Sequence, residues 1–191
     1  LVLGAWENGF RHITNNVRPI VKPEDLKGIK LRVPAGEWRV KMFKAYGANP
    51  TPMAYSEVFT ALKTGVMDGQ ENPYPQIWGG KFHEVQKYIS LSGHVFTPAW
   101  LVASPTHFAK LPEDVQKAIA DSAKETEVFV RELAAKLDNE LLGKMTSASD
   151  MKPNEVDKDA FIAQSGAIYE EFGKSVKNGA ELIKEIQALG N

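Results

Sequence analysis

The stretch GIKLRVPAG at residues 28–36 decides the fold class, because it contains a strand with a sharp stop. Apolar and polar side chains alternate over residues 29–33, which predicts a short β-strand with one buried face. Pro34 and Gly36 end this strand. Apolar side chains then recur at helical spacing and predict a helix with one apolar face, formed by Val40, Phe43 and Tyr46.

The alternation of strands and helices continues on both sides of this stretch. Residues 1–3 look like the end of a buried strand, and the two prolines in residues 72–75 indicate a rigid loop. Further extended segments are expected at residues 49–53, 85–91, 95–103 and 151–153. Further helices are expected from about residue 58 to Gly69, over 158–172 and over 180–189. Such alternation is typical of an α/β protein.

One predicted helix is unusually long and covers residues 112–146. Pro112 suits its first turn, and two acidic residues follow at the positive end of the helix dipole. About thirty residues make a rod of roughly 45 Å, which is too long for an ordinary crossover helix. We therefore expect it to bridge two lobes. Its apolar stripe comprises Val115, Ile119, Ser122, Thr126, Val130, Leu133, Leu137 and Leu141.

Composition excludes several classes of function. The 23 basic and 24 acidic residues give a net charge of -1, which argues against a nucleic-acid partner. The chain has no cysteine, so disulfides, iron–sulfur clusters and thiolate zinc sites are excluded. No apolar run reaches the roughly 18 residues of a membrane span, so no membrane insertion is expected. The sequence starts inside a predicted strand, so we expect a fragment or a processed product.

Motifs of enzymes and metal sites are missing from the sequence. The four histidines have no metal-ligand spacing, and no HExxH, GxSxG, P-loop or GxGxxG motif occurs. We expect no catalysis, no metal and no cofactor. An enzyme on an α/β scaffold is a further alternative, but no nucleophile–base set supports it.

Arginine is scarce in this chain, with five residues against eighteen lysines, and two of the five have suggestive positions. Arg32 lies at the carboxyl end of the predicted strand, the edge at which open α/β sheets bind ligands. A guanidinium there can hold a carboxylate in a bidentate pair, or form a structural salt bridge. Arg11 follows a polar, glycine-containing stretch. Asn72 lies in a tight turn, where it caps its own backbone or contacts a ligand.

Five blocks of the sequence together resemble the solute-binding subunits of tripartite TRAP transporters, the DctP family. The blocks are DLKGIKLRVP at 25–34, GANPTPM at 47–53, EVFTALKTGVMDGQENP at 57–73, KFHEVQKY at 81–88 and LPEDVQ at 111–116. The resemblance covers nearly the whole chain. It implies a periplasmic-binding-protein-like fold of two α/β lobes with a long helix that spans both.

The resemblance also implies roles for individual residues. Arg32 corresponds to the arginine that forms the principal salt bridge with the ligand carboxylate, and Asn72 to the asparagine that hydrogen-bonds to it. Arg11 matches a further arginine often found at the ligand, after a one-residue insertion. Tyr55 falls where the family places an aromatic ring. Glu37 and Trp38 lie in a variable stretch after Arg32, where ligand-specific contacts are common.

The family's chains are longer, and the part without a counterpart here is most of the first lobe. We therefore expect the second, carboxylate-binding lobe at residues 10–97 and 138–191. Residues 98–137 are then a remnant of the first lobe with the start of the long helix.

The function implied is that of a periplasmic, monomeric solute-binding protein that delivers a small organic acid to TRAP membrane subunits. A sugar acid, an aromatic acid and a C4-dicarboxylate remain open as ligands. The alternative is an extracytoplasmic sensor of the same fold that reports an organic acid to a signalling partner.

Overall fold

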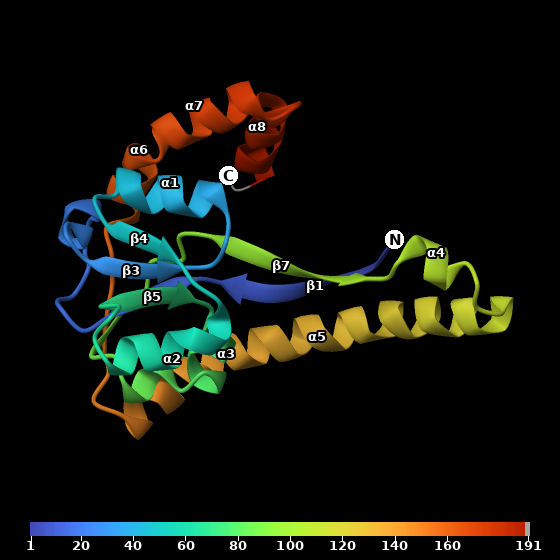
Figure 1. Cartoon of the computed structure of the whole chain (residues 1–191), viewed down its shortest axis with the longest axis horizontal. Coiled ribbons are helices and arrows are strands. Elements are labelled where there is room, and N and C mark those ends of the chain that lie inside the picture. Colours follow the sequence, from blue (N-terminus) through green and yellow to red (C-terminus); the bar gives the residue numbers. More distant parts are fainter. Residues whose placement is uncertain (190–191) are drawn as a thin grey trace. The chain divides into compact units, whose positions relative to one another are not determined.

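Two β-sheets organise the chain, and each lies in a separate compact unit. The computed structural model describes residues 1–189 (Figure 1). Unit 1 comprises Leu1–His12, Asn72–Glu84 and Gly93–Asp150, and unit 2 comprises Ile13–Glu71, Val85–Ser92 and the chain from Met151 onward. Strands and helices alternate in both, so the predicted α/β class is confirmed.

These units are bounded differently from the predicted lobes. Residues 10–12, 72–84, 93–97 and 138–150 belong to unit 1, whereas the prediction assigned them to the carboxylate-binding lobe. The physical reason for the last of these differences is that one uninterrupted helix, α5 (Glu113–Ala148), contains residues 138–148. Which lobe of a family member each unit represents stays a prediction.

The sheet of unit 2 has six strands in the order β4-β3-β5-β2-β6-β8. β3 pairs in parallel with both β4 and β5, so the carboxyl ends of these three strands meet at one edge. β6 is antiparallel to β2 and parallel to β8. The strands are β2 (His12–Asn15), β3 (Lys30–Val33), β4 (Asn49–Pro52), β5 (Gly69–Asn72), β6 (Tyr88–Ser90) and β8 (Lys152–Asn154).

Helices α1 and α2 lie on opposite faces of β3, β4 and β5 (Figure 1). The α1 face contains an apolar core, in which Phe43 and Tyr46 pack against Leu31 and Val33 of β3. Phe161 closes this core at an edge-on angle to Tyr46. The helical elements of unit 2 are η1 (Pro23–Leu26), α1 (Glu37–Ala45), α2 (Tyr55–Lys63), α6 (Lys158–Gln164), α7 (Gly166–Ser175) and α8 (Gly179–Leu189).

Unit 1 is built on a two-stranded antiparallel ribbon, with α5 packed along it (Figure 1). Its elements are β1 (Val2–Phe10), α3 (Tyr74–Gly79), η2 (Phe82–Glu84), β7 (Phe96–Val102), α4 (Pro105–Phe108) and α5. β7 continues through Pro98, which pairs with Glu7 next to a register shift in β1. No helix within residues 1–189 combines the length and the apolar composition needed to cross a membrane.

Most predicted elements are confirmed, including β3, α1, the long helix and the last helix. The predicted rigid loop at residues 72–75 is wrong. Asn72 ends β5 and α3 begins at Tyr74, because proline is tolerated in the first turn of a helix and Pro75 takes such a position.

Three further differences concern where two of the helices end and how far the N-terminal strand is buried. α2 ends at Lys63 rather than near Gly69, because Gly65 adopts a φ of 74° that a helix cannot continue through. The helix expected over 158–172 is two helices that meet at Ser165. Leu1 and Val2 are more than half exposed, so the strand at the N-terminus was predicted correctly but its burial was not.

Candidate functional site

Arg32 is a buried arginine at the carboxyl end of β3. Its side chain is held by the backbone, since Nε and Nη2 both donate to the carbonyl oxygen of Met53, at 2.9 and 2.6 Å. Met53 directly follows β4, which pairs with β3. Only 3% of Arg32 is exposed. The guanidinium is therefore fixed in orientation at the sheet edge at which open α/β proteins bind ligands.

Tyr55, at the start of α2, lies within electrostatic range of Arg32. Partial burial raises the pKa of the Tyr55 phenol above its ordinary value, and the positive charge of Arg32 acts in the opposite direction. A tyrosine hydroxyl is neutral near pH 7 in any case, so that of Tyr55 can both donate and accept hydrogen bonds. Tyr55 is 43% exposed. Arg32 and Tyr55 together present a cation and a neutral hydroxyl.

Arg11 and Asn72 form a second pair, within unit 1. Arg11 follows β1, and its Nη2 donates to Oδ1 of Asn72 at 3.0 Å in a buried contact. The Arg11 backbone is anchored by an N–H that donates to the carbonyl of Val95. A guanidinium has only donors, so the contact assigns Oδ1 of Asn72 as acceptor and makes its amide nitrogen the donor end.

Glu37 and Trp38 occupy the first turn of α1. The ring of Trp38 packs edge-on against Phe172 of α7 at 5.1 Å between centroids, and the Lys41 ammonium lies 4.5 Å from the Trp38 ring centroid. These contacts give Trp38 a packing role between two helices. Glu37 is exposed and borders a groove of about 510 Å³, together with Ala35, Gly36, Val40, Lys41, Lys44 and Pro52.

The structure thus groups the six predicted residues into three places. Arg32 lies near Tyr55, Arg11 contacts Asn72, and Glu37 and Trp38 share a helical turn. The first and third places belong to unit 2, and the second belongs to unit 1.

One ion pair near these residues was missed by the sequence analysis. Arg39 of α1 contacts Glu71 of β5 at 2.8 Å between Nη1 and Oε2, and the Glu71 side chain is fully buried. The scarcity of arginine was the available signal, because Arg39 is one of the five. The partner could not be named, since it lies 32 positions away on another strand.

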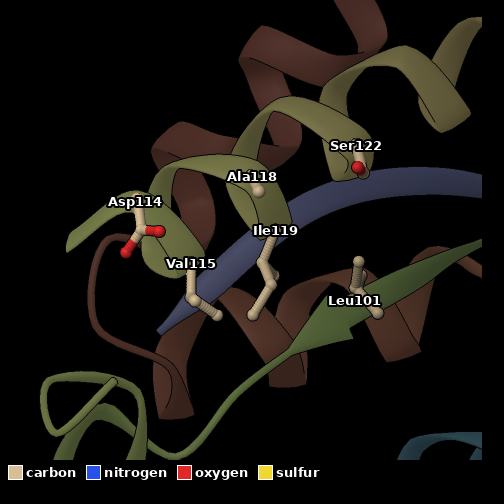
Figure 2. Close-up of a pocket in the computed structure, with 6 residues that line it drawn as sticks. All are labelled: Leu101, Asp114, Val115, Ala118, Ile119 and Ser122. Carbon is tan, nitrogen blue, oxygen red and sulfur yellow. The ribbon is translucent and has the colours of Figure 1, made fainter. Parts of the chain in front are cut away.

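A second groove lies within unit 1, between β7 and α5. Figure 2 shows Val115 and Ile119 extending from the helix toward Leu101 of the strand. Its volume is about 450 Å³, and its other lining residues are Asp114, Ala118 and Ser122. The one charged group among these six residues is an acid. This groove is therefore unsuited to an anion, and Arg32 remains the better candidate.

Comparison with known proteins decides the family. The family model of the bacterial extracellular solute-binding proteins, family 7 (DctP), matches residues 1–175. The chain belongs to this family. The predicted resemblance is confirmed, and with it the periplasmic-binding-protein-like α/β class.

Individual relatives of this DctP-family chain are similar over nearly its whole length. The 2,3-diketo-L-gulonate-binding periplasmic protein YiaO of Escherichia coli K12 is 37% identical over 98% of this chain and 58% of its own length. A TRAP periplasmic solute-binding protein from Polaromonas sp. JS666, bound to D-erythronate, superposes with a TM-score of 0.92 at 38% identity. That match covers 98% of this chain and 61% of the other.

A third relative was solved with a different kind of acid. The TRAP periplasmic solute-binding protein from Shewanella oneidensis with bound succinate has a TM-score of 0.89 and 30% identity, over 93% of this chain and 59% of its own. The chain thus spans about three fifths of the length of the relatives it matches.

Proposed function

We propose that this DctP-family chain captures a small organic acid for a tripartite TRAP transporter, without chemical change to the acid. The observation that carries the proposal is the likeness, at a TM-score of 0.92, to a family member solved with D-erythronate. Arg32 supports it from this chain's own geometry, because it is a buried, oriented cation at the carboxyl end of the parallel strands β3, β4 and β5.

The proposed anchor is a salt bridge from Arg32 to the ligand carboxylate. The two bonds to the Met53 carbonyl hold the guanidinium in place before a ligand arrives, so little side-chain entropy is lost on binding. A charge-assisted bond in a site shielded from water is stronger than the same bond in solvent. The Tyr55 hydroxyl is proposed to contact the same ligand, together with Glu37 and Trp38 of the variable stretch.

Asn72 and Arg11 are proposed as the further contacts to the ligand carboxylate. Arg11 orients the amide of Asn72, which makes its nitrogen the end that donates to an anion. We assign Arg11, Asn72 and Arg32 to the same ligand because the chain belongs to the DctP family.

A sugar acid is the proposed ligand class. Family members similar to this chain were solved with D-erythronate, L-galactonate and D-glucuronate, each a hydroxylated acid with one carboxylate. Arg32 and the neutral Tyr55 hydroxyl supply one cation and one polar group for such a ligand. Succinate, found in another relative, has two carboxylates and would need a second cation, for which Arg11 is the candidate.

Delivery to TRAP membrane subunits, in the periplasm, is the proposed outcome of binding. A gene for such subunits next to the gene for this chain would support delivery, whereas a neighbouring kinase gene would indicate a sensor. Uptake of the acid by proteoliposomes that contain the membrane subunits should then require this protein.

The test of binding uses protein expressed from its complete reading frame and isothermal titration calorimetry with D-erythronate, D-glucuronate and succinate. Arg32→Ala is expected to weaken acid binding by about 2–5 kcal/mol, a loss of at least roughly thirtyfold in affinity. Arg131→Ala is the matched control, since Arg131 is an exposed arginine of α5 that pairs with Glu127 of the same helix. The affinity of the Arg131→Ala variant for each acid should equal that of the native protein.

Two results would contradict the proposal. The carboxylate salt bridge is refuted if Arg32→Ala binds acids as tightly as the native protein does. The function itself is refuted if the native protein binds no organic acid of a broad panel in a thermal-shift screen, because a tight ligand must raise the melting temperature by mass action.

A further inference from the structure

The ring of His12 packs face to face against the ring of Tyr74, two residues after Asn72. The ring centroids lie 4.4 Å apart, and the ring planes are inclined by 14°. Tyr74 is the first residue of α3 and is only 8% exposed, so its ring is enclosed as well as stacked. Contacts between aromatic rings are favourable and depend on geometry. His12 therefore fixes the point at which the chain leaves β5 and enters α3.

The backbone sets the orientation of the His12 imidazole. Its Nδ1 accepts a hydrogen bond from the N–H of Gly93 at 3.3 Å. The bond assigns Nδ1 as the nitrogen without a proton, so the imidazole is neutral in this contact and Nε2 carries the proton. Gly93 has a φ of 52°, a conformation that glycine adopts without strain. The ring that stacks on Tyr74 is thus held in one plane and one tautomer.

The residue before His12 contacts the other end of the same turn. Arg11 donates from Nη2 to Oδ1 of Asn72 at 3.0 Å in a buried contact. Two adjacent residues therefore contact the residues on either side of Pro73, and all of these residues lie within unit 1. The pyrrolidine ring of Pro73 restricts its φ, which is -67°. A movement of Tyr74 is thus transmitted to Asn72 through a short and stiff piece of backbone.

We propose that His12 is a positioning residue for ligand binding: its stack with Tyr74 keeps the Asn72 amide where it meets the ligand carboxylate. The inference rests on the proposed function, in which Asn72 is a contact to that carboxylate. Arg11 sets which end of the amide donates, and His12 sets where the amide lies. His12 itself is assigned no contact with the ligand.

The experiment is a double-mutant cycle of acid binding, measured by calorimetry on protein expressed from its complete reading frame. Its probe is D-erythronate, or the acid of the thermal-shift panel that raises the melting temperature more. We expect His12→Ala to weaken binding by about tenfold, and Asn72→Ala to weaken it at least as much. The double variant should bind as Asn72→Ala alone does, because His12 acts through Asn72. Two independent losses would multiply instead.

Two further variants isolate the stack. His12→Phe keeps a ring against Tyr74, so its affinity should stay within about threefold of the native value. His107→Ala is the matched control, since His107 is an exposed histidine of α4 in the same unit, and its affinity should be native. If a variant of the cycle does not fold, His12→Asn or Asn72→Ser takes its place. His12→Asn retains an acceptor for the Gly93 N–H but has no ring.

The outcomes separate this inference from the function on which it rests. Losses that multiply in the double variant overturn the inference, because His12 would then act independently of Asn72. Native affinity in the folded His12 variant of the cycle overturns it too, as does a His12→Phe protein that binds as weakly as His12→Ala. An equal loss in His107→Ala overturns it because the effect would be nonspecific. Failure of the native protein to bind any acid of the panel refutes the proposed function instead.

Discussion

Gly69 of β5 occupies a position where even one methyl group does not fit. A Cβ atom there would lie 2.3 Å from the carbonyl oxygen of Thr14 and 2.8 Å from Cβ of Asn15. Ordinary contacts of this kind are about 3.5 Å, so the strands must separate by roughly 1 Å to admit alanine. The neighbouring strand β2 cannot yield easily, because the Thr14 hydroxyl is bonded to Gln70 and Gln86, both at 2.9 Å.

Gly69→Ala is therefore expected to lower the free energy of unfolding by about 3 kcal/mol, the upper part of the range for overpacked cores. The midpoint of urea unfolding, followed by tryptophan fluorescence, should fall by about 1 M or more. Acid affinity should fall as well, since β5 also carries Glu71 and Asn72.

Gly143→Ala is the matched control for this substitution. Gly143 lies in α5, and a Cβ atom there meets nothing within 4 Å. Alanine also has the higher helix propensity, so this variant should gain about 0.5–1 kcal/mol. A Gly69→Ala protein with the native unfolding midpoint would refute the reasoning, because it would mean that β2 and β5 separate freely.

Two further predictions concern stability. Tyr46→Phe removes the buried 2.7 Å hydrogen bond to Ser165 and should lower the free energy of unfolding by about 1 kcal/mol in urea titrations, whereas the exposed Tyr169→Phe should not. The pKa of Asp138 is raised, first by burial and second by the negative charge of Glu7. The folded state therefore binds a proton on Asp138 more tightly than the unfolded chain does. The stability that this proton contributes is present at low pH and is lost as pH rises through the pKa of the folded state. Asp138→Asn should therefore melt above the native protein at about pH 7, and this advantage should shrink toward about pH 4; an advantage independent of pH would contradict it.

Much of the backbone could be predicted because local pattern sets it. Alternation over residues 29–33 predicted β3, and periodicity predicted α5, since each depends on neighbours a few positions away. The start of α3 at Tyr74 was missed because a proline-rich stretch is compatible both with a rigid loop and with the first turn of a helix. Packing selected the helix, as the burial of Tyr74 and Ile77 shows.

Burial along α5 shows the limit of this kind of prediction. The apolar stripe was extended evenly from Val115 to Leu141, but Val115 and Leu133 are exposed, while Leu141 is buried. Periodicity identifies which side of a helix can be covered. It does not say which turns have something packed against them.

For the candidate site, local periodicity and the scarcity of arginine were enough to predict the α/β class and the placement of Arg32 at a strand end. The contacts between side chains depended on tertiary packing. Arg11 meets Asn72 across 61 positions and Arg39 meets Glu71 across 32, through strand order and register. A side chain's partner depends on which strands become neighbours, and that is set by long-range packing rather than by the residues beside it.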